Sequence, residues 1–211
     1  MIKTVIFDFD STLYVGDVWE NWIEHLKKLY KYVVNDDEKL KKILEKYDLK
    51  KYNSTLDAEI IAEKENLSLR RLKKFLKEKL YVHSTNDVKV IDSNFIKELK
   101  KHCHLYVISI SGQEYLKHYF DLYHLDKKDF KKIYSLDLYA KDKTKGLLMK
   151  KIMKKEKCSP EETVMIGDNL ETDIKPAQKL NLNYLHFTGD FNQIYKYFTD
   201  KKVLDGTKYI K

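Results

Sequence analysis

The chain has 211 residues, a formal net charge of +8 and 43% hydrophobic residues, a length sufficient for one or two domains with a substantial core. Its two cysteines, Cys103 and Cys158, lie far apart in no paired pattern. This argues against a disulfide-stabilised secreted fold and predicts a reducing, cytoplasmic location. No apolar run approaches the roughly 18 residues of a membrane-spanning helix, so no membrane partner is expected.

The first predicted element is a strand over residues 5–7, whose sequence Val-Ile-Phe is typical of a strand buried on both faces of a parallel sheet. Asp8 and Asp10 follow it directly, separated by one residue. Because an unpaired buried carboxylate is costly, we expect a bound cation there. Ligands of open α/β sheets collect at the carboxyl ends of strands. With the hydroxyl of Thr12, the two acids predict a Mg²⁺ site that handles phosphate.

Residues 16–83 predict a small all-helical unit inserted after this strand. Apolar residues recur in it at intervals of three and four, the period of an amphipathic helix. Four helices are predicted. The first two span residues 18–34 and 38–47. The third begins at a cap, Ser54 or Thr55, and ends at about residue 65, and the fourth begins at a cap on Ser68. Taken alone, this pattern indicates a packed helical subdomain without a defined role.

A second buried strand is predicted over residues 105–108, after a helix over residues 93–101. The segment Ser109-Ile110-Ser111-Gly112 follows, and then a helix over residues 113–122. A helix N-terminus presents free N–H groups and a favourable dipole, so hydroxyl groups at this position suit an anion. Residues 132–136 favour a third strand.

Lysines cluster ahead of the next predicted helix, residues 147–155. A lysine at the start of a helix opposes the macrodipole, which indicates a buried anionic partner. Lys145 is the best candidate because its Lys-Gly step opens the helix, and Lys141 and Lys143 remain alternatives.

A further pair of acids follows the strand predicted over residues 163–167. Asp168 comes directly after Gly167, which allows a tight turn, and Asp173 lies five residues further on. These acids are again placed for Mg²⁺, although Asp173 could instead cap a helix over residues 174–180. A strand over residues 183–187 and a helix over residues 191–198 complete the predicted elements.

The segment Asp8-Phe9-Asp10-Ser11-Thr12 resembles the DxDxT signature of the haloacid dehalogenase-like (HAD) phosphatases. Ser109, Lys145 and the GDxxxxD segment 167–173 resemble the second, third and fourth motifs of that family, in the right order. The resemblance covers residues 1–14 and about 88–190 by motif, and the insertion only by position and helical character. It implies an α/β fold with a Rossmann-like parallel-sheet core, residues 1–15 and 84–211, and an inserted all-helical cap domain, residues 16–83.

The resemblance also implies roles for particular residues. Asp8 would be the nucleophile that forms an aspartyl-phosphate, and Asp10 the general acid and base. The substrate phosphate would be held by Thr12, Ser109, Ile110 and Lys145, with Ser111 and Lys143 as alternatives. Mg²⁺ would be held by Asp8, the backbone carbonyl of Asp10, Asp168, Asn169 and Asp173. Two departures stand out, because the family often has Asn or Gly where this chain has Ile110, and its usual proline after the lysine is absent.

The function predicted from these motifs is Mg²⁺-dependent hydrolysis of a small phosphorylated metabolite. A phosphotransferase or mutase of the same superfamily would use the same residues. A non-catalytic, basic nucleic-acid-binding protein on the same scaffold is the third alternative. The lysines interleave with apolar residues on helical segments, which favours a solvated helix surface over a nucleic-acid-binding one. Nothing in the sequence indicates an oligomeric state.

Overall fold

The computed structural model describes residues 1–16, 19–49, 55–79, 88–135, 144–205 and 207–210. The chain forms two compact units, one made of residues 1–16 and 89–211 and the other of residues 17–88. No helix among the described residues is both long and apolar enough to cross a membrane.

The first unit is built on a five-stranded parallel sheet with the strand order β5-β4-β1-β6-β7. The strands are β1 (Thr4–Phe7), β4 (His104–Ser109), β5 (Lys132–Ser135), β6 (Thr163–Gly167) and β7 (Asn183–His186). Central β1 is paired on both sides, with β4 and with β6, and all four of its residues are buried. The carboxyl ends of these three strands therefore lie at one edge of the sheet, where ligands of such folds collect. The predicted α/β fold with a parallel sheet is confirmed.

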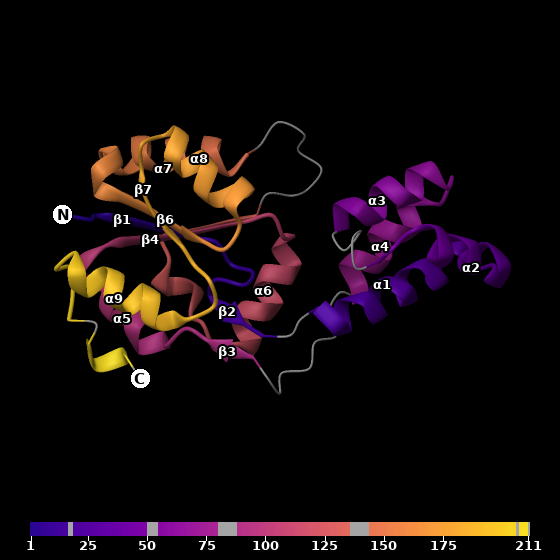
Figure 1. Ribbon diagram of the computed structural model, residues 1–211, viewed down its shortest axis with the longest axis horizontal. Helices are drawn as coiled ribbons and strands as arrows, with labels where there is room; N and C mark the ends of the chain where they lie inside the picture. Colours follow the sequence, from indigo (N-terminus) through magenta and orange to yellow (C-terminus); the bar gives the residue numbers. More distant parts are fainter. Residues whose placement is uncertain (17–18, 50–54, 80–87, 136–143, 206, 211) are drawn as a thin grey trace. The chain divides into compact units, whose positions relative to one another are not determined.

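Helices cover both faces of the sheet (Figure 1). On one face lie α7 (Lys145–Glu156) and α8 (Lys175–Lys179), and on the other lie α5 (Ser93–His102), α6 (Gln113–Leu122) and α9 (Phe191–Asp200). Short 3-10 turns span Lys127–Asp129, Pro160–Glu162 and Thr207–Tyr209, and a single π-helical turn spans Leu170–Ile174.

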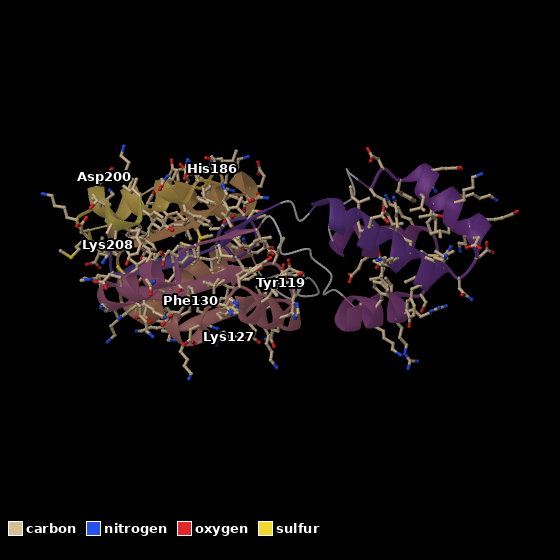
Figure 2. All side chains as sticks on the ribbon, turned by 90° about the horizontal axis from the view of Figure 1, so that it is seen from below. Tyr119, Lys127, Phe130, His186, Asp200 and Lys208 are labelled. Atoms are coloured by element: carbon tan, nitrogen blue, oxygen red, sulfur yellow. The ribbon has the colours of Figure 1, made fainter. Side chains whose placement is uncertain are left out.

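The core of this unit is formed by the alternating side chains of the strands. Ile6 of β1 is fully buried in a cluster with Met149 and Ile152 of α7. The next residue, Phe7, points to the opposite face and meets Phe130 edge to face. Figure 2 shows where Phe130 lies in this unit. Burying each such side chain contributes roughly 1.5–3 kcal/mol, so β1 is fixed from both faces. The acidic segment that follows β1 thus starts from a rigid support.

The second unit is all-helical among its described residues, as predicted. Its helices are α1 (Trp19–Val34), α2 (Asp37–Lys46), α3 (Thr55–Lys64) and α4 (Leu69–Lys79). Helix α1 packs against α2 and α4, and α3 packs against α4. The core that they share includes the buried side chains of Leu26, Leu29, Tyr30, Ile61 and Leu72. Thr55 is the first residue of α3, whereas the alternative cap Ser54 lies outside the described residues.

Two short strands close the first unit where the insertion leaves and returns. β2 (Tyr14–Val15) pairs antiparallel with β3 (Lys89–Val90), with Tyr14 opposite Val90 and Val15 opposite Lys89. The Ile91 N–H also donates to the Leu13 carbonyl at 3.0 Å. The sequence does not predict this pairing, because two residues are too few to show an alternating pattern.

Candidate active site

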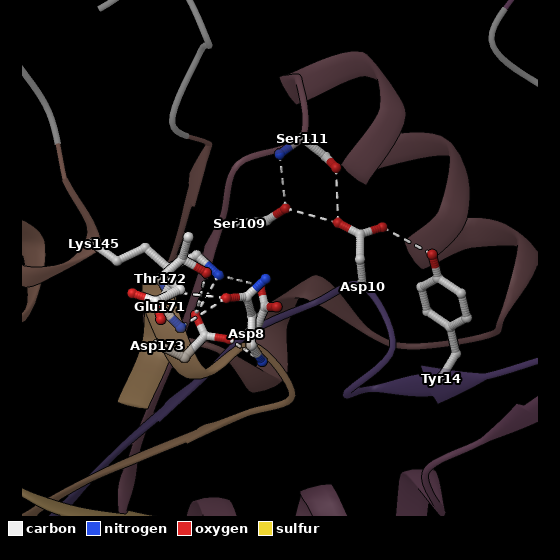
Figure 3. Close-up of polar contacts among 10 residues, drawn as sticks. Asp8, Asp10, Tyr14, Ser109, Ser111, Lys145, Glu171, Thr172 and Asp173 are labelled. Atoms are coloured by element: carbon white, nitrogen blue, oxygen red, sulfur yellow. Dashed lines mark hydrogen bonds and ion pairs between the residues drawn. The ribbon is translucent and has the colours of Figure 1, made fainter. Parts of the chain in front are cut away.

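The loop after β1 sends its two carboxylates in different directions. The Asp8 N–H donates to the Ile166 carbonyl of β6 at 2.8 Å, so Asp8 continues the line of the strand. At Ser11 the chain turns through a left-handed conformation, with φ of 56°, and the Leu13 N–H donates back to the Phe9 carbonyl at 3.0 Å. As a result, the side chains of Asp8 and Asp10 point into two separate groups of residues (Figure 3).

Asp8 belongs to a group that we call the charged cluster, which consists of Asp8, Lys145, Asp168 and Asp173. Lys145 Nζ lies 2.7 Å from Asp8 Oδ1 and 2.6 Å from Asp173 Oδ1. All three of these side chains are buried, with exposed fractions of 7% or less. The carboxylates of Asp8, Asp168 and Asp173 can each place one oxygen within 4.8 Å of the others. The structure thus brings the predicted lysine and three predicted acids together.

Lys145 is the first residue of α7, two residues earlier than the predicted start of this helix. The Thr144 side chain caps the helix by accepting the Leu147 N–H at 3.4 Å, which lets α7 begin at the lysine. The two carboxylates supply the buried anionic partner that offsets the unfavourable dipole at this position. The alternatives Lys141 and Lys143 lie outside the described residues.

Asp173 is positioned by the π-helical turn and by Gly167. Its Oδ2 accepts the Asn169 N–H at 3.1 Å. A Cβ atom on Gly167 would lie only 2.4 Å from that Oδ2, so a glycine is required for this close approach. The suggested role of Asp173 as a helix cap is wrong, because α8 begins at Lys175 and receives no cap from Asp173.

One predicted metal ligand, Asn169, has other partners in the structure, and the prediction for Asp10 concerns its backbone carbonyl rather than its carboxylate. The Asn169 side-chain oxygen accepts the N–H groups of Glu171 and Thr172, at 2.9 and 3.1 Å, and so caps the π-helical turn. The Asp10 carboxylate points away from the charged cluster (Figure 3). The sequence could not show which groups these two side chains contact, because it does not fix the direction of side chains in a loop.

The charges of the cluster do not balance. Burial, opposed by the charge of Lys145 and reinforced by that of Asp173, raises the pKa of Asp8 well above its usual range. Burial and the charge of Asp173 also raise the pKa of Asp168. Although burial alone would lower it, the two adjacent carboxylates raise the pKa of the Lys145 ammonium. One ammonium faces three carboxyl groups, and the raised pKa values of Asp8 and Asp168 show that ionising all three together is unfavourable in this largely buried site.

These residues fit a divalent metal ion. Mg²⁺ prefers oxygen ligands and binds through one or two carboxylates, and the cluster offers three carboxylate groups close together. A double positive charge would also favour the ionised forms of these carboxyl groups. The residues that could hold such an ion are Asp8, Asp168 and Asp173.

Asp10 belongs to a second group, the hydroxyl cluster, which consists of Asp10, Tyr14, Ser109, Ser111 and Tyr115. Asp10 Oδ2 accepts the hydroxyls of Ser109 at 3.0 Å and Ser111 at 2.7 Å. Asp10 Oδ1 accepts the hydroxyl of Tyr14 at 2.8 Å. The Tyr14 and Tyr115 hydroxyls lie 3.1 Å apart. Both serines that the sequence proposed for the phosphate therefore contact the same carboxylate oxygen.

The loop that carries the serines is fixed from two sides. Ser109 ends β4, its side chain is buried, and its Oγ accepts the Ser111 N–H at 2.9 Å. The Ser135 hydroxyl donates to the Ser111 carbonyl at 2.6 Å. Ile110 is 41% exposed between the two serines. Thr12 is fully buried, and its Oγ1 has no hydrogen-bond partner within the described part of the chain.

Tyr14 and Tyr115 also belong to this site, although nothing in the sequence marks them as members. Burial, together with the charge of Asp10, raises the pKa of both phenols well above their usual range, so both stay protonated. Tyr14 follows Asp10 by four residues across an irregular turn, and Tyr115 lies on α6. No period or motif relates such positions, so only the folded chain brings them together.

The sequence matches the family model of the haloacid dehalogenase-like hydrolases over residues 5–187. This match spans most of the chain, and the protein therefore belongs to the haloacid dehalogenase-like hydrolase family. A search of curated proteins found no match.

Solved structures of this family share the fold. A HAD phosphatase from Thermococcus onnurineus is 18% identical, with a TM-score of 0.58, and the match covers 90% of this chain and 88% of that one. A HAD family enzyme from Bacteroides thetaiotaomicron, solved with magnesium and inorganic phosphate, is 19% identical, with a TM-score of 0.54 and coverage of 92% and 99%. A hydrolase of the family from Streptococcus pneumoniae is 16% identical, with a TM-score of 0.57 and coverage of 93% and 90%.

Proposed function

We propose that this protein is a Mg²⁺-dependent phosphomonoester hydrolase that acts through an aspartyl-phosphate on Asp8. The observation that carries the proposal is the contrast between two carboxylates on one loop. Asp8 lies against an ammonium group and two further carboxylates, whereas Asp10 is held by neutral hydroxyls. Pairs of carboxylates in different environments are typical of enzymes that give them different roles.

In the first step, an Asp8 oxygen attacks the phosphorus atom and the bond from phosphorus to the leaving oxygen breaks. Asp10 gives its proton to that oxygen, so the alcohol leaves neutral. In the second step, Asp10 takes a proton from water, the water oxygen attacks phosphorus, and the bond to Asp8 breaks to release phosphate. Asp10 ends the cycle protonated, as it began.

The remaining residues would hold the phosphoryl group in line. Phosphoryl transfer depends mainly on positioning and on neutralising charge. Lys145 would contact phosphoryl oxygens from beside Asp8, and the hydroxyls of Ser109 and Ser111 would turn from Asp10 to the phosphate. Mg²⁺ bound by Asp8, Asp168 and Asp173 would supply positive charge to the phosphoryl oxygens.

The helical unit, residues 17–88, is proposed to be a cap domain that selects a small phosphorylated metabolite. Support comes from its place in the chain, between the loop of Asp8 and the remainder of the sheet. The magnesium and phosphate in the related Bacteroides thetaiotaomicron structure are in line with the proposed chemistry.

The test is hydrolysis of p-nitrophenyl phosphate with Mg²⁺ or with EDTA. We expect Mg²⁺-dependent release of nitrophenol by the wild type and a loss of at least about 10⁴-fold in Asp8→Asn. Asp190→Asn is the matched control, because Asp190 caps α9 and asparagine caps a helix equally well. Hydroxylamine should trap the acyl phosphate as a hydroxamate at Asp8, identified by peptide mass spectrometry. Undiminished Mg²⁺-dependent turnover in Asp8→Asn would refute the assignment of the nucleophile.

A further inference from the structure

The Asp10 carboxylate has contacts of two kinds on its two oxygens. Oδ2 accepts the hydroxyls of Ser109 and Ser111, while Oδ1 accepts the phenol of Tyr14. A general acid must be held in one orientation while one of its oxygens stays available to the leaving group. One of these two kinds of contact must therefore hold Asp10 during turnover.

We propose that Tyr14, backed by Tyr115, is a positioning residue that fixes Asp10 through Oδ1 and leaves Oδ2 free to exchange a proton with the leaving group and with water. This inference rests on the proposed phosphatase function and adds to it a residue that acts through Asp10. The serine contacts to Oδ2 are then the ones that substrate replaces, because both serines face the phosphate in the proposed reaction.

The Tyr14 ring is rigidly held. It is 2% exposed, and its centroid lies 5.4 Å from that of Phe9, 6.2 Å from that of Tyr119 and 4.7 Å from that of Tyr123. A tyrosine has only two rotatable side-chain bonds, and packing on several sides leaves its hydroxyl in one place. The packed ring fixes the position of the phenol oxygen, whereas rotation about the Cα–Cβ bond of a serine moves its Oγ, so the phenol oxygen is the more firmly placed donor atom.

The backbone of Tyr14 is fixed as well. Its strand, β2, pairs with β3, which places Tyr14 opposite Val90. The hydrogen bond from the Ile91 N–H to the Leu13 carbonyl extends this attachment by one residue. The phenol therefore reaches Asp10 from a support that is separate from the loop after β1.

Tyr115 completes a chain of hydroxyls. Its oxygen lies 3.1 Å from that of Tyr14, so it can donate to Tyr14 while Tyr14 donates to Asp10. Because the exchanged proton lies on Oδ2, Oδ1 remains an acceptor for the neutral Tyr14 hydroxyl in both the protonated and the ionised form of Asp10. A lysine or a carboxylate in place of Tyr14 would suit only one of these two forms. The hydroxyl chain keeps Asp10 in place in both steps of the reaction.

The experiment compares two esters that differ in their need for an acid. Phenolate is a much stronger base than p-nitrophenolate, so phenyl phosphate depends on protonation of its leaving oxygen far more than p-nitrophenyl phosphate does. The quantity measured is kcat/KM of the Mg²⁺-loaded, full-length protein for each ester.

We expect Tyr14→Phe to lower kcat/KM for phenyl phosphate by about 10- to 100-fold. This is a part of the factor of about 10²–10⁴ that general acid catalysis contributes. For p-nitrophenyl phosphate we expect kcat/KM to fall by less than about threefold, because its leaving group needs little protonation by an acid.

Tyr123→Phe is the matched control. Tyr123 packs against Tyr14, but its hydroxyl is buried without a hydrogen-bond partner within the described part of the chain. Removing it changes the same aromatic group without touching Asp10, so the ratio of the two kcat/KM values should stay at the wild-type value. Tyr115→Phe should shift the ratio in the same direction as Tyr14→Phe but by a smaller factor.

Equal losses on both esters in Tyr14→Phe would overturn the proposal and leave the phosphatase function in place. If circular dichroism shows that Tyr14→Phe does not fold, Tyr115→Phe provides the test. An unchanged ratio of the two kcat/KM values in Tyr115→Phe would then overturn the proposal. A folded, Mg²⁺-loaded wild type that hydrolyses neither ester would instead refute the proposed function, and this inference with it.

Discussion

Asp8 and Asp10 lie on one short loop, but the charged cluster around Asp8 and the hydroxyl cluster around Asp10 are stabilised by different interactions. In the charged cluster, a single buried ammonium faces three carboxylates, so each partner depends strongly on the others. In the hydroxyl cluster, neutral groups that can both donate and accept surround one carboxylate. Loss of one member of a buried ion pair is far more costly than loss of a neutral hydrogen bond. The two clusters should therefore respond very differently to mutation.

The largest effect on stability is expected for Lys145→Met. This change leaves Asp8 and Asp173 buried without a cation, and removing one partner of a buried ion pair costs about 3–5 kcal/mol. The free energy of unfolding, measured with urea in metal-free buffer, should fall by that amount at pH 7. Lys175→Met is the control, because the Lys175–Glu171 pair is exposed and should contribute less than about 0.5 kcal/mol.

The difference in unfolding free energy between wild type and Lys145→Met should depend on pH in a defined way. The pKa of Lys145 is raised in the folded state by the charges of Asp8 and Asp173, against the effect of burial. A lysine whose pKa is raised by folding stabilises the folded protein. This stabilisation is complete at a pH below the lysine pKa in the unfolded chain, about 10.4, and it is lost as the pH rises through the lysine pKa in the folded protein. The difference between wild type and Lys145→Met should hold from pH 7 to pH 10 and shrink above it. A difference of under 1 kcal/mol at pH 7 would contradict the described ion pairs.

Mg²⁺ should stabilise the charged cluster and not the hydroxyl cluster. At a Mg²⁺ concentration 100 times its Kd, binding to the folded protein contributes about 2.7 kcal/mol, which thermal unfolding measures as a rise in Tm. We expect this rise to be lost in Asp168→Asn, which removes one carboxylate of the cluster, and kept in Ser111→Ala. An equal rise in Tm for Asp168→Asn would show that Mg²⁺ binds elsewhere.

Gly167→Ala should disturb the charged cluster without changing any charge. The added Cβ would lie 2.4 Å from Asp173 Oδ2, so Asp173 must move, at a cost of about 1–3 kcal/mol in the free energy of unfolding. Gly112→Ala, beside the hydroxyl cluster, is the matched control, because its Cβ would meet nothing within 4 Å. Denaturant unfolding of both variants, with and without Mg²⁺, tests the contrast, and equal losses in the two variants would refute it.

The smallest effects are expected within the hydroxyl cluster. Ser109 is buried and takes part in two hydrogen bonds through its hydroxyl, whereas Ser111 donates one from a partly exposed position. Ser109→Ala should therefore lower the free energy of unfolding by about 1.5 kcal/mol and Ser111→Ala by about 0.5 kcal/mol. Urea unfolding of the two variants measures the difference, and a larger loss in Ser111→Ala would reverse our ranking of the two serines.

Much of the fold was predictable because its strands are short apolar runs that stand out in a lysine-rich sequence. Residues 5–7, 105–108 and 163–167 all lie within strands of the sheet, and helical periodicity indicated the four helices of the insertion. Asp8 and Asp168 were found for a related reason, since each directly follows a buried strand, and Asp173 was found through the GDxxxxD segment that begins there. Their catalytic and metal-binding roles remain predictions.

The sequence could not reveal features that depend on side-chain direction or on very short elements. The capping role of Asn169 and the direction of the Asp10 carboxylate, away from the charged cluster, follow from loop conformations that no periodicity encodes. The same holds for the hydrogen bond from Tyr14 to Asp10, which joins two residues across an irregular turn. Gly167 was predicted to permit a tight turn, and the structure adds the close approach of Asp173 as a second requirement for glycine.

The pairing of β2 with β3 gives the chain a modular design. Val15 and Lys89 are directly opposed in an antiparallel pair, so the insertion leaves the first unit and re-enters it at adjacent points. Topologically, residues 16–88 are an expanded hairpin turn, which a two-residue Asn-Gly turn could replace. Because the entropy of closing a loop grows only slowly with its length, inserts of very different size can be exchanged at this junction without opening the sheet. The junction is thus a natural point for recombination, by evolution or by protein engineering.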